Sequence, residues 1–157
     1  MTVDAGGSAS HGRAPSAPLN SSLHFIRALL RPTIHDAVMS HDAPSALRYV
    51  RYDGARENEY VPAMRQLISK DLSEPYSIYV YRYFLYQWGD LCFLAMDDKD
   101  EMVGVVVSKL EPHRGGPLRG YIAMLAVRQE FRGQGIATKL VRMAIDAMIE
   151  RDADEVC

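Results

Sequence analysis

A periodic apolar stripe in the last quarter of the chain limits the possible folds more than any other feature. Apolar residues recur at positions 136, 137, 140, 141, 144, 145, 148 and 149, the 3.6-residue period of a helix with one buried face. Residues 118–127 are expected to form a strand before it, and Gly133 and Gly135 lie between the two. The sequence therefore predicts a strand, a glycine turn and an amphipathic helix in succession.

Upstream residues predict further elements of both kinds. Residues 47–52 alternate apolar and polar side chains, as a half-buried strand does. Asn58 is expected to cap a helix that runs to about Asp71, with Pro62 in its first turn. One face of that helix is then apolar and comprises Val61, Met64, Leu67 and Ile68.

The segment 74–88 can be interpreted in two ways. Its β-branched and aromatic residues favour a strand. Its length, the capping position of Ser73, the early Pro75 and the terminal Gly89 are typical of a helix, and a helix is expected. Two strands joined by a hairpin follow at 91–96 and 102–110, and residues 154–157 resemble the start of another strand.

The first 45 residues differ in composition from the rest. Fourteen of the first 22 are Gly, Ser, Ala or Pro, and none is aromatic. Such a segment buries too little surface to offset its ordering entropy. Residues 1–45 are expected to be a disordered low-complexity extension, with a transit peptide as the alternative, and residues 46–157 to be the folded domain.

Composition excludes several classes of protein. The 18 basic and 20 acidic residues nearly balance, which argues against a nucleic-acid binder that works by bulk charge. No run approaches the roughly 20 apolar residues of a membrane-spanning helix. Cys92 and Cys157 can form no disulfide framework, so a reduced, cytoplasmic environment is expected. They also match no metal spacing, so no metal is expected.

The glycine turn carries the strongest chemical signal. Glycines between a strand and a helix let the backbone approach a ligand, and helix-start amides favour a phosphate. Arg132 adds a positive charge there. The alternative is a turn with no ligand. A P-loop is excluded because Thr138 and Lys139 stand in the wrong order without its first glycine, and a dinucleotide fingerprint lacks its third glycine.

The pattern Arg-x-x-Gly-x-Ala at 132–137 resembles the acyl-CoA signature of the GNAT acetyltransferases. The order of elements is also that of the family, which implies an α/β fold with a mixed, mostly antiparallel sheet and flanking helices. Residues 72–85 and 119–127 resemble the catalytic subunits of NatC-type N-terminal protein acetyltransferases more narrowly. The resemblance covers residues 47–157.

This resemblance implies a site for acetyl-CoA as co-substrate. Backbone amides around Leu125, Ala126 and Val127 would hold the pantetheine arm. Those of Arg132, Gly133, Gln134, Gly135, Ile136 and Ala137 would hold the pyrophosphate. The pocket for the substrate N-terminus would be lined by Leu72, Glu74, Pro75 and Tyr76.

The implied reaction moves an acetyl group to the α-amine of nascent proteins that begin with Met and a bulky apolar residue. Tyr121 stands where related enzymes place a catalytic tyrosine; the alternative is a tyrosine that packs the cleft. Glu74 could hold the peptide amine or simply begin a helix. Tyr76, Tyr79 and Tyr83 could form a peptide-binding wall or belong to the core.

The family works with NatC auxiliary subunits near ribosomes in the cytoplasm, so these partners are implied, with no direct nucleic acid or membrane contact. Family members continue beyond the strand that begins near Glu155 and carry further catalytic residues there. By this resemblance, residues 46–157 would be the N-terminal two-thirds or so of a GNAT domain, incomplete after the acetyl-CoA-binding helix. We therefore expect this chain alone to be poorly stable and weak or inactive. A non-catalytic fragment that binds CoA or an auxiliary subunit, and an acetyltransferase of small-molecule amines, are the alternatives.

Overall fold

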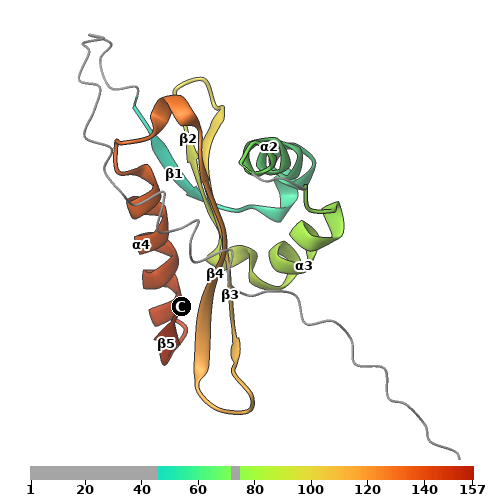
Figure 1. The fold of residues 1–157 in the computed structure, drawn as a ribbon, viewed down its shortest axis with the longest axis vertical. Coiled ribbons are helices and arrows are strands. Elements are labelled where there is room, and N and C mark those ends of the chain that lie inside the picture. The colour runs from blue at the N-terminus through green and yellow to red at the C-terminus, as the bar shows by residue number, and fades with distance from the viewer. Residues whose placement is uncertain (1–45, 72–74) are drawn as a thin grey trace, which may run out of the picture.

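The structure, a computed structural model, describes residues 46–71 and 75–157. These residues form one five-stranded sheet in the order β1-β2-β3-β4-β5 (Figure 1). Neighbouring strands are antiparallel except the last pair, which is parallel. The strands are β1 (Arg48–Arg51), β2 (Phe93–Met96), β3 (Met102–Pro112), β4 (Leu118–Val127) and β5 (Glu155–Val156).

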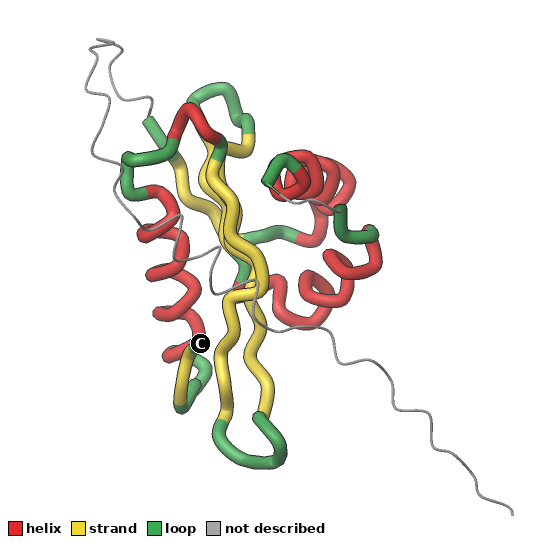
Figure 2. Tube along the Cα trace, in the orientation of Figure 1, coloured by secondary structure: helices red, strands yellow, loops and turns green. Residues whose placement is uncertain are grey.

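Helices cover both faces of this sheet. Figures 1 and 2 show α2 (Glu57–Ser69) and α3 (Ile78–Trp88) on one face and α4 (Ile136–Ile149) on the other. Short 3-10 helices occupy Gly54–Arg56, Gly89–Leu91 and Gln129–Phe131. The predicted strand–turn–helix succession is present, because β4 leads through the last of these 3-10 turns and the glycines into α4.

Most of the apolar stripe of α4 packs on the sheet as its period predicts, but its last member, Ile149 at the end of the helix, is 61% exposed. Ile136, Leu140, Ala144 and Met148 are buried on this face. Gly104 of β3 lies beneath the helix, and a Cβ there would come within 3.1 Å of the Ile136 and Leu140 side chains. The absence of a side chain at position 104 therefore lets α4 approach the sheet closely.

The opposite face buries the apolar sides of α2 and α3. The predicted α2 face is confirmed, since Val61, Met64, Leu67 and Ile68 are all buried there. From α3, Tyr81 and Leu85 join this second core. The sheet is thus covered on both sides, and β2 and most of β3 are buried.

The starts of the two helices on this face differ from the prediction. Asn58 does not cap α2. Instead, the Asp53 carboxylate accepts from the Ala55 N–H and begins a 3-10 turn that continues into the helix, so Pro62 falls in the second turn. The helix α3 begins after Ser77, not Ser73, and Pro75 precedes it. Both errors arose because several residues near each start can cap a helix.

The few buried polar groups near the centre of the sheet are mostly bonded. Trp88 Nε1 donates to the Leu110 carbonyl oxygen at 2.8 Å. The Cys92 thiol contacts the Trp88 carbonyl, and burial raises its pKa to about 12. Cys157, the second cysteine, is exposed, and neither thiol is in a disulfide.

The predicted extension, residues 1–45, lies outside the described residues. Within the part of the chain that the structure describes, no helix is long and apolar enough to cross a membrane.

Candidate functional site

The two halves of β4 have different surroundings on the edge that faces away from β3. Residues 118–122 lie beside β5, and the Ile122 N–H donates to the Cys157 carbonyl oxygen at 3.3 Å. A bulge follows at Ala123, where the register with β3 shifts by one residue. From there to Val127, β4 has no strand on this edge among residues 46–71 and 75–157.

The register with β3 decides which groups of this half point to the open edge. Arg128 N–H donates to the Val103 carbonyl oxygen, so alternate residues of the strand bond to β3 and the residues between them face outward. Leu125 and Val127 face outward, whereas Ala126 belongs to the ladder with β3. Of the three residues predicted to hold pantetheine, two therefore present backbone groups to the open edge.

The turn between β4 and α4 forms a cradle of backbone N–H groups next to this edge. Gly133 and Gly135 have φ of 78° and 79°, a conformation in which a Cβ is strained. The first helical bond joins Lys139 N–H to the Gly135 carbonyl oxygen. The N–H groups of residues 136–138 have no partner within the described part of the chain, and they head a 14-residue helix. Such a cradle suits a diphosphate.

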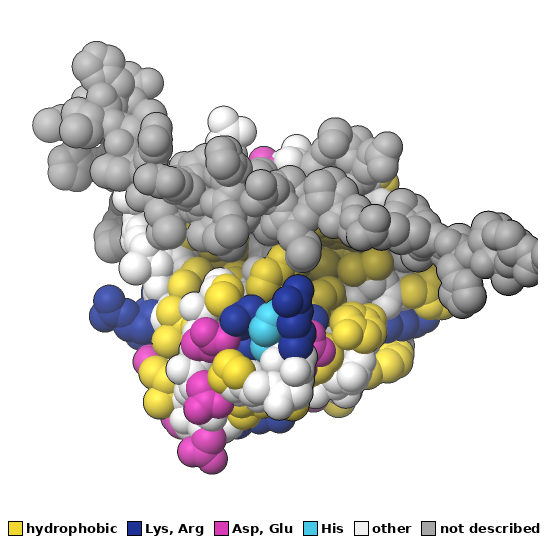
Figure 3. All heavy atoms as spheres, turned by 60° about the horizontal axis from the view of Figure 1, so that its bottom comes forward, with side chains coloured by type: hydrophobic (Ala, Val, Ile, Leu, Met, Phe, Trp, Pro, Cys, Tyr) yellow, Lys and Arg dark blue, Asp and Glu magenta, His cyan; other side chains and the backbone are white. Residues whose placement is uncertain are grey.

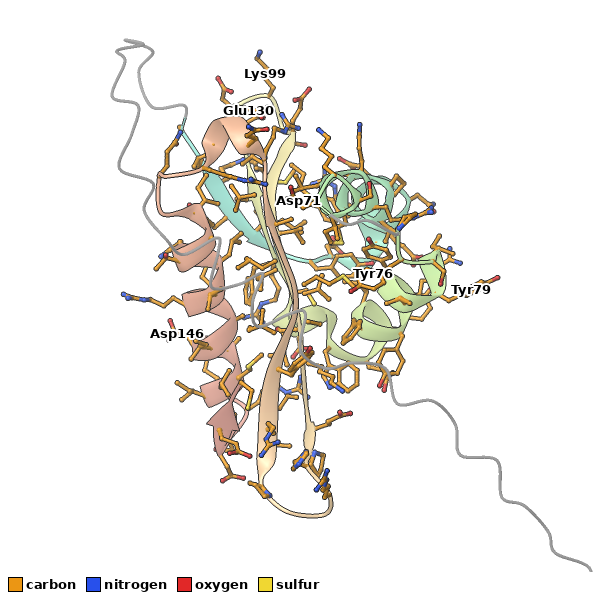
Figure 4. All side chains as sticks on the ribbon, viewed as in Figure 1. Asp71, Tyr76, Tyr79, Lys99, Glu130 and Asp146 are labelled. Carbon is orange, nitrogen blue, oxygen red and sulfur yellow. The ribbon has the colours of Figure 1, made fainter. Side chains whose placement is uncertain are left out.

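Arg132 connects this cradle to the opposite side of the sheet. Its Nε donates to the Val127 carbonyl oxygen at 3.0 Å, and its Nη2 donates to Asp71 Oδ2 at 2.7 Å. Asp71 directly follows the last turn of α2, and Figure 4 places it between α2 and the sheet. The predicted positive charge beside the cradle is thus held by an acid whose role the sequence did not reveal.

Tyr121 lies in the lower half of β4, residues 118–122, which is paired with β5, and its side chain is half-buried. Its register partner on β3 is Lys109, whose ammonium lies 5.9 Å from the centre of the Tyr121 ring and 6.0 Å from that of Trp88. Lys109 also forms an ion pair with Glu111. The tyrosine therefore stands in an aromatic and charged cluster, a surrounding that neither of its two predicted roles had included.

The predicted substrate residues are only partly described. Leu72 and Glu74 lie outside the described residues, whereas Pro75 is exposed and Tyr76 is 39% exposed. Tyr79 and Tyr83 are 75% and 47% exposed, and Tyr79 points away from the body of the protein (Figure 4). The interpretation of these three tyrosines as core residues is wrong, because the buried side of α3 is formed by other residues.

The end of the molecule near the turn between β3 and β4 carries charges of both signs. Arg119 Nε bonds to Glu155 Oε1 at 2.6 Å, next to the Lys109–Glu111 pair. Figure 3 shows basic, acidic and apolar side chains side by side on this end. No field of a single sign arises here from the described residues, in keeping with the balanced composition.

A groove of about 400 Å³ lies elsewhere, between α2 and the β2–β3 turn. Its walls include Tyr60, Leu67, Met96, Met102 and Arg128. None of the predicted site residues lines it.

Residues 61–156 match the Acetyltransferase (GNAT) family. Two relatives are both described as N-alpha-acetyltransferase 30. The protein from Homo sapiens is 49% identical over 138 residues, which cover 88% of this chain and 36% of the human protein. The protein from Schizosaccharomyces pombe is 54% identical over 99 residues, which cover 63% of this chain and 65% of the relative.

One solved structure gives a similar result in three dimensions. It is the crystal structure of the NatC complex bound to Gag peptide and CoA, in which one chain is 49% identical with a TM-score of 0.66. The match covers 70% of this chain and 71% of that chain. The predicted resemblance to NatC is thereby confirmed.

This chain spans only about a third of the length of the human relative and less than two thirds of the fission-yeast one. The family match nevertheless covers most of the chain and contains β4, the glycine turn and α4. The order and packing of the elements agree with the predicted fold. The chain belongs to the GNAT acetyltransferase family.

Proposed function

We propose that this chain is the catalytic part of a NatC-type N-terminal acetyltransferase, which transfers the acetyl group of acetyl-CoA to protein α-amines. The observation that carries the proposal is the 49% identity with a chain of the NatC complex, at a TM-score of 0.66. The open edge of β4 and the cradle before α4 support it, because together they offer N–H groups that have no partner in residues 46–71 and 75–157.

The described residues fit acetyl-CoA by the chemistry of their donors. The N–H groups that head α4 would hold the diphosphate, because the helix dipole favours negative charge there. The outward backbone groups of Leu125 and Val127 would bond to the amides of the pantetheine arm, as a neighbouring strand would. These contacts would use backbone groups and need no basic side chain. This agrees with the structure, in which the Arg132 guanidinium bonds to Val127 and Asp71.

The reaction requires a neutral amine. The α-amine has a reference pKa of about 7.7–8.0, so part of it is protonated at neutral pH and a base must remove that proton. The neutral amine then attacks the thioester carbonyl, and the tetrahedral intermediate expels the CoA thiolate. Tyr121 is the described residue that we assign as the donor of a proton to the leaving thiolate, and its phenol regains a proton from solvent. Lys109 lies beside its ring.

The substrates are proteins that begin with Met followed by a bulky apolar residue. Tyr76 supplies an aromatic wall for that residue, with its ring edge-on to Tyr81 at 6.4 Å between centres. As in the NatC complex, auxiliary subunits complete the enzyme, and it acts in the cytoplasm on chains that emerge from the ribosome.

Two measurements test the proposal. Calorimetry with CoA is expected to show one site per chain. Transfer of labelled acetyl groups is expected to be faster to a Met-Leu peptide than to a Ser-Ser peptide or to spermidine. CoA binding without transfer to any amine would support the non-catalytic alternative, and preference for spermidine would support an acetyltransferase of small molecules. No CoA binding would contradict the proposal.

A further inference from the structure

The charges along α4 run opposite to the order that a helix dipole favours. The first turn of α4 contains no acidic residue, and its last turn contains no basic one. Lys139 and Arg142 lie in the first half of the helix. Asp146 lies in the second half, and Glu150 follows the last turn. Because anions are stabilising near the start of a helix and cations near its end, this order disfavours the helix in the absence of a ligand.

Lys139 and Arg142 are also neighbours of like charge. They are three residues apart, so their side chains lie next to each other on the helix surface, where like charges repel. Both are exposed, whereas the buried residues of α4 face the sheet. Neither forms an ion pair within residues 46–71 and 75–157, unlike Arg132 and Arg151, which are each paired with an aspartate. The two cations therefore gain nothing from the described acids.

The place of these cations along the helix fits the cofactor of the proposed function. At a rise of about 1.5 Å per residue, Lys139 lies about 5 Å and Arg142 about 9 Å beyond Ile136 along the axis. CoA carries a third phosphate besides its diphosphate, on the 3′-oxygen of the ribose to which the diphosphate is attached. With the diphosphate on the N–H groups of residues 136–138, this phosphate would lie within reach of long side chains one to two turns along α4.

We propose that Lys139 and Arg142 bind the 3′-phosphate of CoA and make the chain select CoA over dephospho-CoA. The inference rests on the proposed function and adds two side chains that lie outside the signature at 132–137. A phosphate monoester carries a charge of about −1.5 to −2 at pH 7, which two cations balance. The guanidinium offers parallel N–H donors to two phosphate oxygens, and the ammonium acts as a point charge.

The test compares the affinities of CoA and dephospho-CoA, which differ only in this phosphate, by calorimetry. The unaltered chain is expected to bind CoA about tenfold more tightly, since each exposed charge pair contributes up to about fivefold. Lys139→Met and Arg142→Met should each lower this preference to about threefold, and the double variant should lower it below about twofold. The affinity for dephospho-CoA should change less than about threefold in all three variants.

Arg65→Met is the matched control. Arg65 is also exposed and forms no ion pair within the described part of the chain, but it belongs to α2, on the opposite face of the sheet (Figure 1). Its loss changes the net charge by the same amount and should leave the preference for CoA unchanged. Added salt should weaken the preference of the unaltered chain and of this control alike, because the contacts with the phosphate are exposed.

A stability measurement distinguishes phosphate binding from a structural role. Methionine is a good helix former, and its substitution removes charges that oppose the dipole and each other. The free energy of unfolding of the double variant in urea, without ligand, should therefore equal or exceed that of the unaltered chain. A lower value would mean that the two cations serve the stability of α4, which contradicts the inference.

The outcomes separate the inference from the proposed function. Equal affinities of CoA and dephospho-CoA for the unaltered chain, or a full preference in the double variant, would overturn the inference and leave the proposed function standing. A loss of preference in Arg65→Met as large as in the single variants would also overturn it, since net charge would then be the cause. If neither compound binds to the unaltered chain, the proposed function and the inference are both wrong.

Discussion

Strand β4 is a single ten-residue strand whose halves differ on one edge. The lower half, below the bulge at Ala123, is paired with β5, and Gly120 lets both β5 and α4 pack tightly against it. The upper half pairs only with β3 among the described residues and faces the glycine cradle. The lower half contributes to stability, while the upper half has backbone groups without a partner among the described residues, where the proposed cofactor would bind. The backbone of one strand can therefore bond to β5 in one half and keep its N–H and C=O groups open to a ligand in the other.

The largest expected effect comes from a charge placed in the cradle of the upper half. Ala137→Glu puts a carboxylate beside the helix-start N–H groups, where it competes with a diphosphate and repels it. We expect CoA affinity to fall by about 100-fold, roughly 3 kcal/mol, as measured by calorimetry. Ile149→Glu adds the same charge at the exposed far end of α4 and should change affinity less than about twofold. Equal losses in both variants would contradict a local cradle.

The second prediction concerns the lower half. Gly120→Val adds a side chain whose Cβ collides with the Met148 sulfur and lies 3.2 Å from a Val156 methyl group. Overpacking of this kind costs about 1–3 kcal/mol, so the free energy of unfolding in urea should fall by about that amount. CoA affinity, measured well below the unfolding transition, should stay within about threefold, because the upper half is untouched. Unchanged stability would show that β5 does not pack here as described.

Amide hydrogen exchange compares the two halves directly. The Ile122 N–H is bonded to Cys157, whereas those of Leu125 and Val127 lack a partner within the described residues. The latter two should exchange faster in the free chain, and saturating CoA should slow them by about tenfold or more. Ile122 serves as the internal control and should change little. Slowing at Ala126 instead of its neighbours would mean that the register with β3 is wrong.

The smallest effect is expected for the ion pair that joins β4 to β5. Glu155→Gln breaks its bond to Arg119, and both side chains are about one third exposed. Such pairs contribute about 0.2–1 kcal/mol, so unfolding should shift only slightly, and less at high salt. Arg119→Met should give a similar loss. A loss above about 2 kcal/mol would mean that this contact, rather than Gly120, holds the lower half together.

Much of the fold followed from local patterns. The α4 stripe and the α2 face could be predicted because their period is a property of a few consecutive turns. The strand that became β4 was also placed with its observed ends, residues 118 and 127. The starts of α2 and α3 could not be predicted, since Asn58 and Ser73 are of the same capping types as Asp53 and Ser77, which stand at the observed starts.

The site was less accessible to prediction. The glycines at 133 and 135 predicted the cradle, because a backbone with positive φ favours glycine. The bulge at Ala123 and the contacts of Arg132 with Asp71 and of Lys109 with Tyr121 left no local pattern. Each joins residues of different strands or layers, and only the folded chain brings them together.

The two cysteines of the chain differ in chemical accessibility, which has a practical use. The Cys92 thiol is buried, and its raised pKa keeps it protonated and unreactive at neutral pH. Cys157 is exposed, and its backbone bonds to Gly120 and Ile122. A maleimide dye should therefore label the unaltered protein at one point, beside the paired half of β4. Its emission would report whether that junction opens when ligands arrive, without any engineered attachment site.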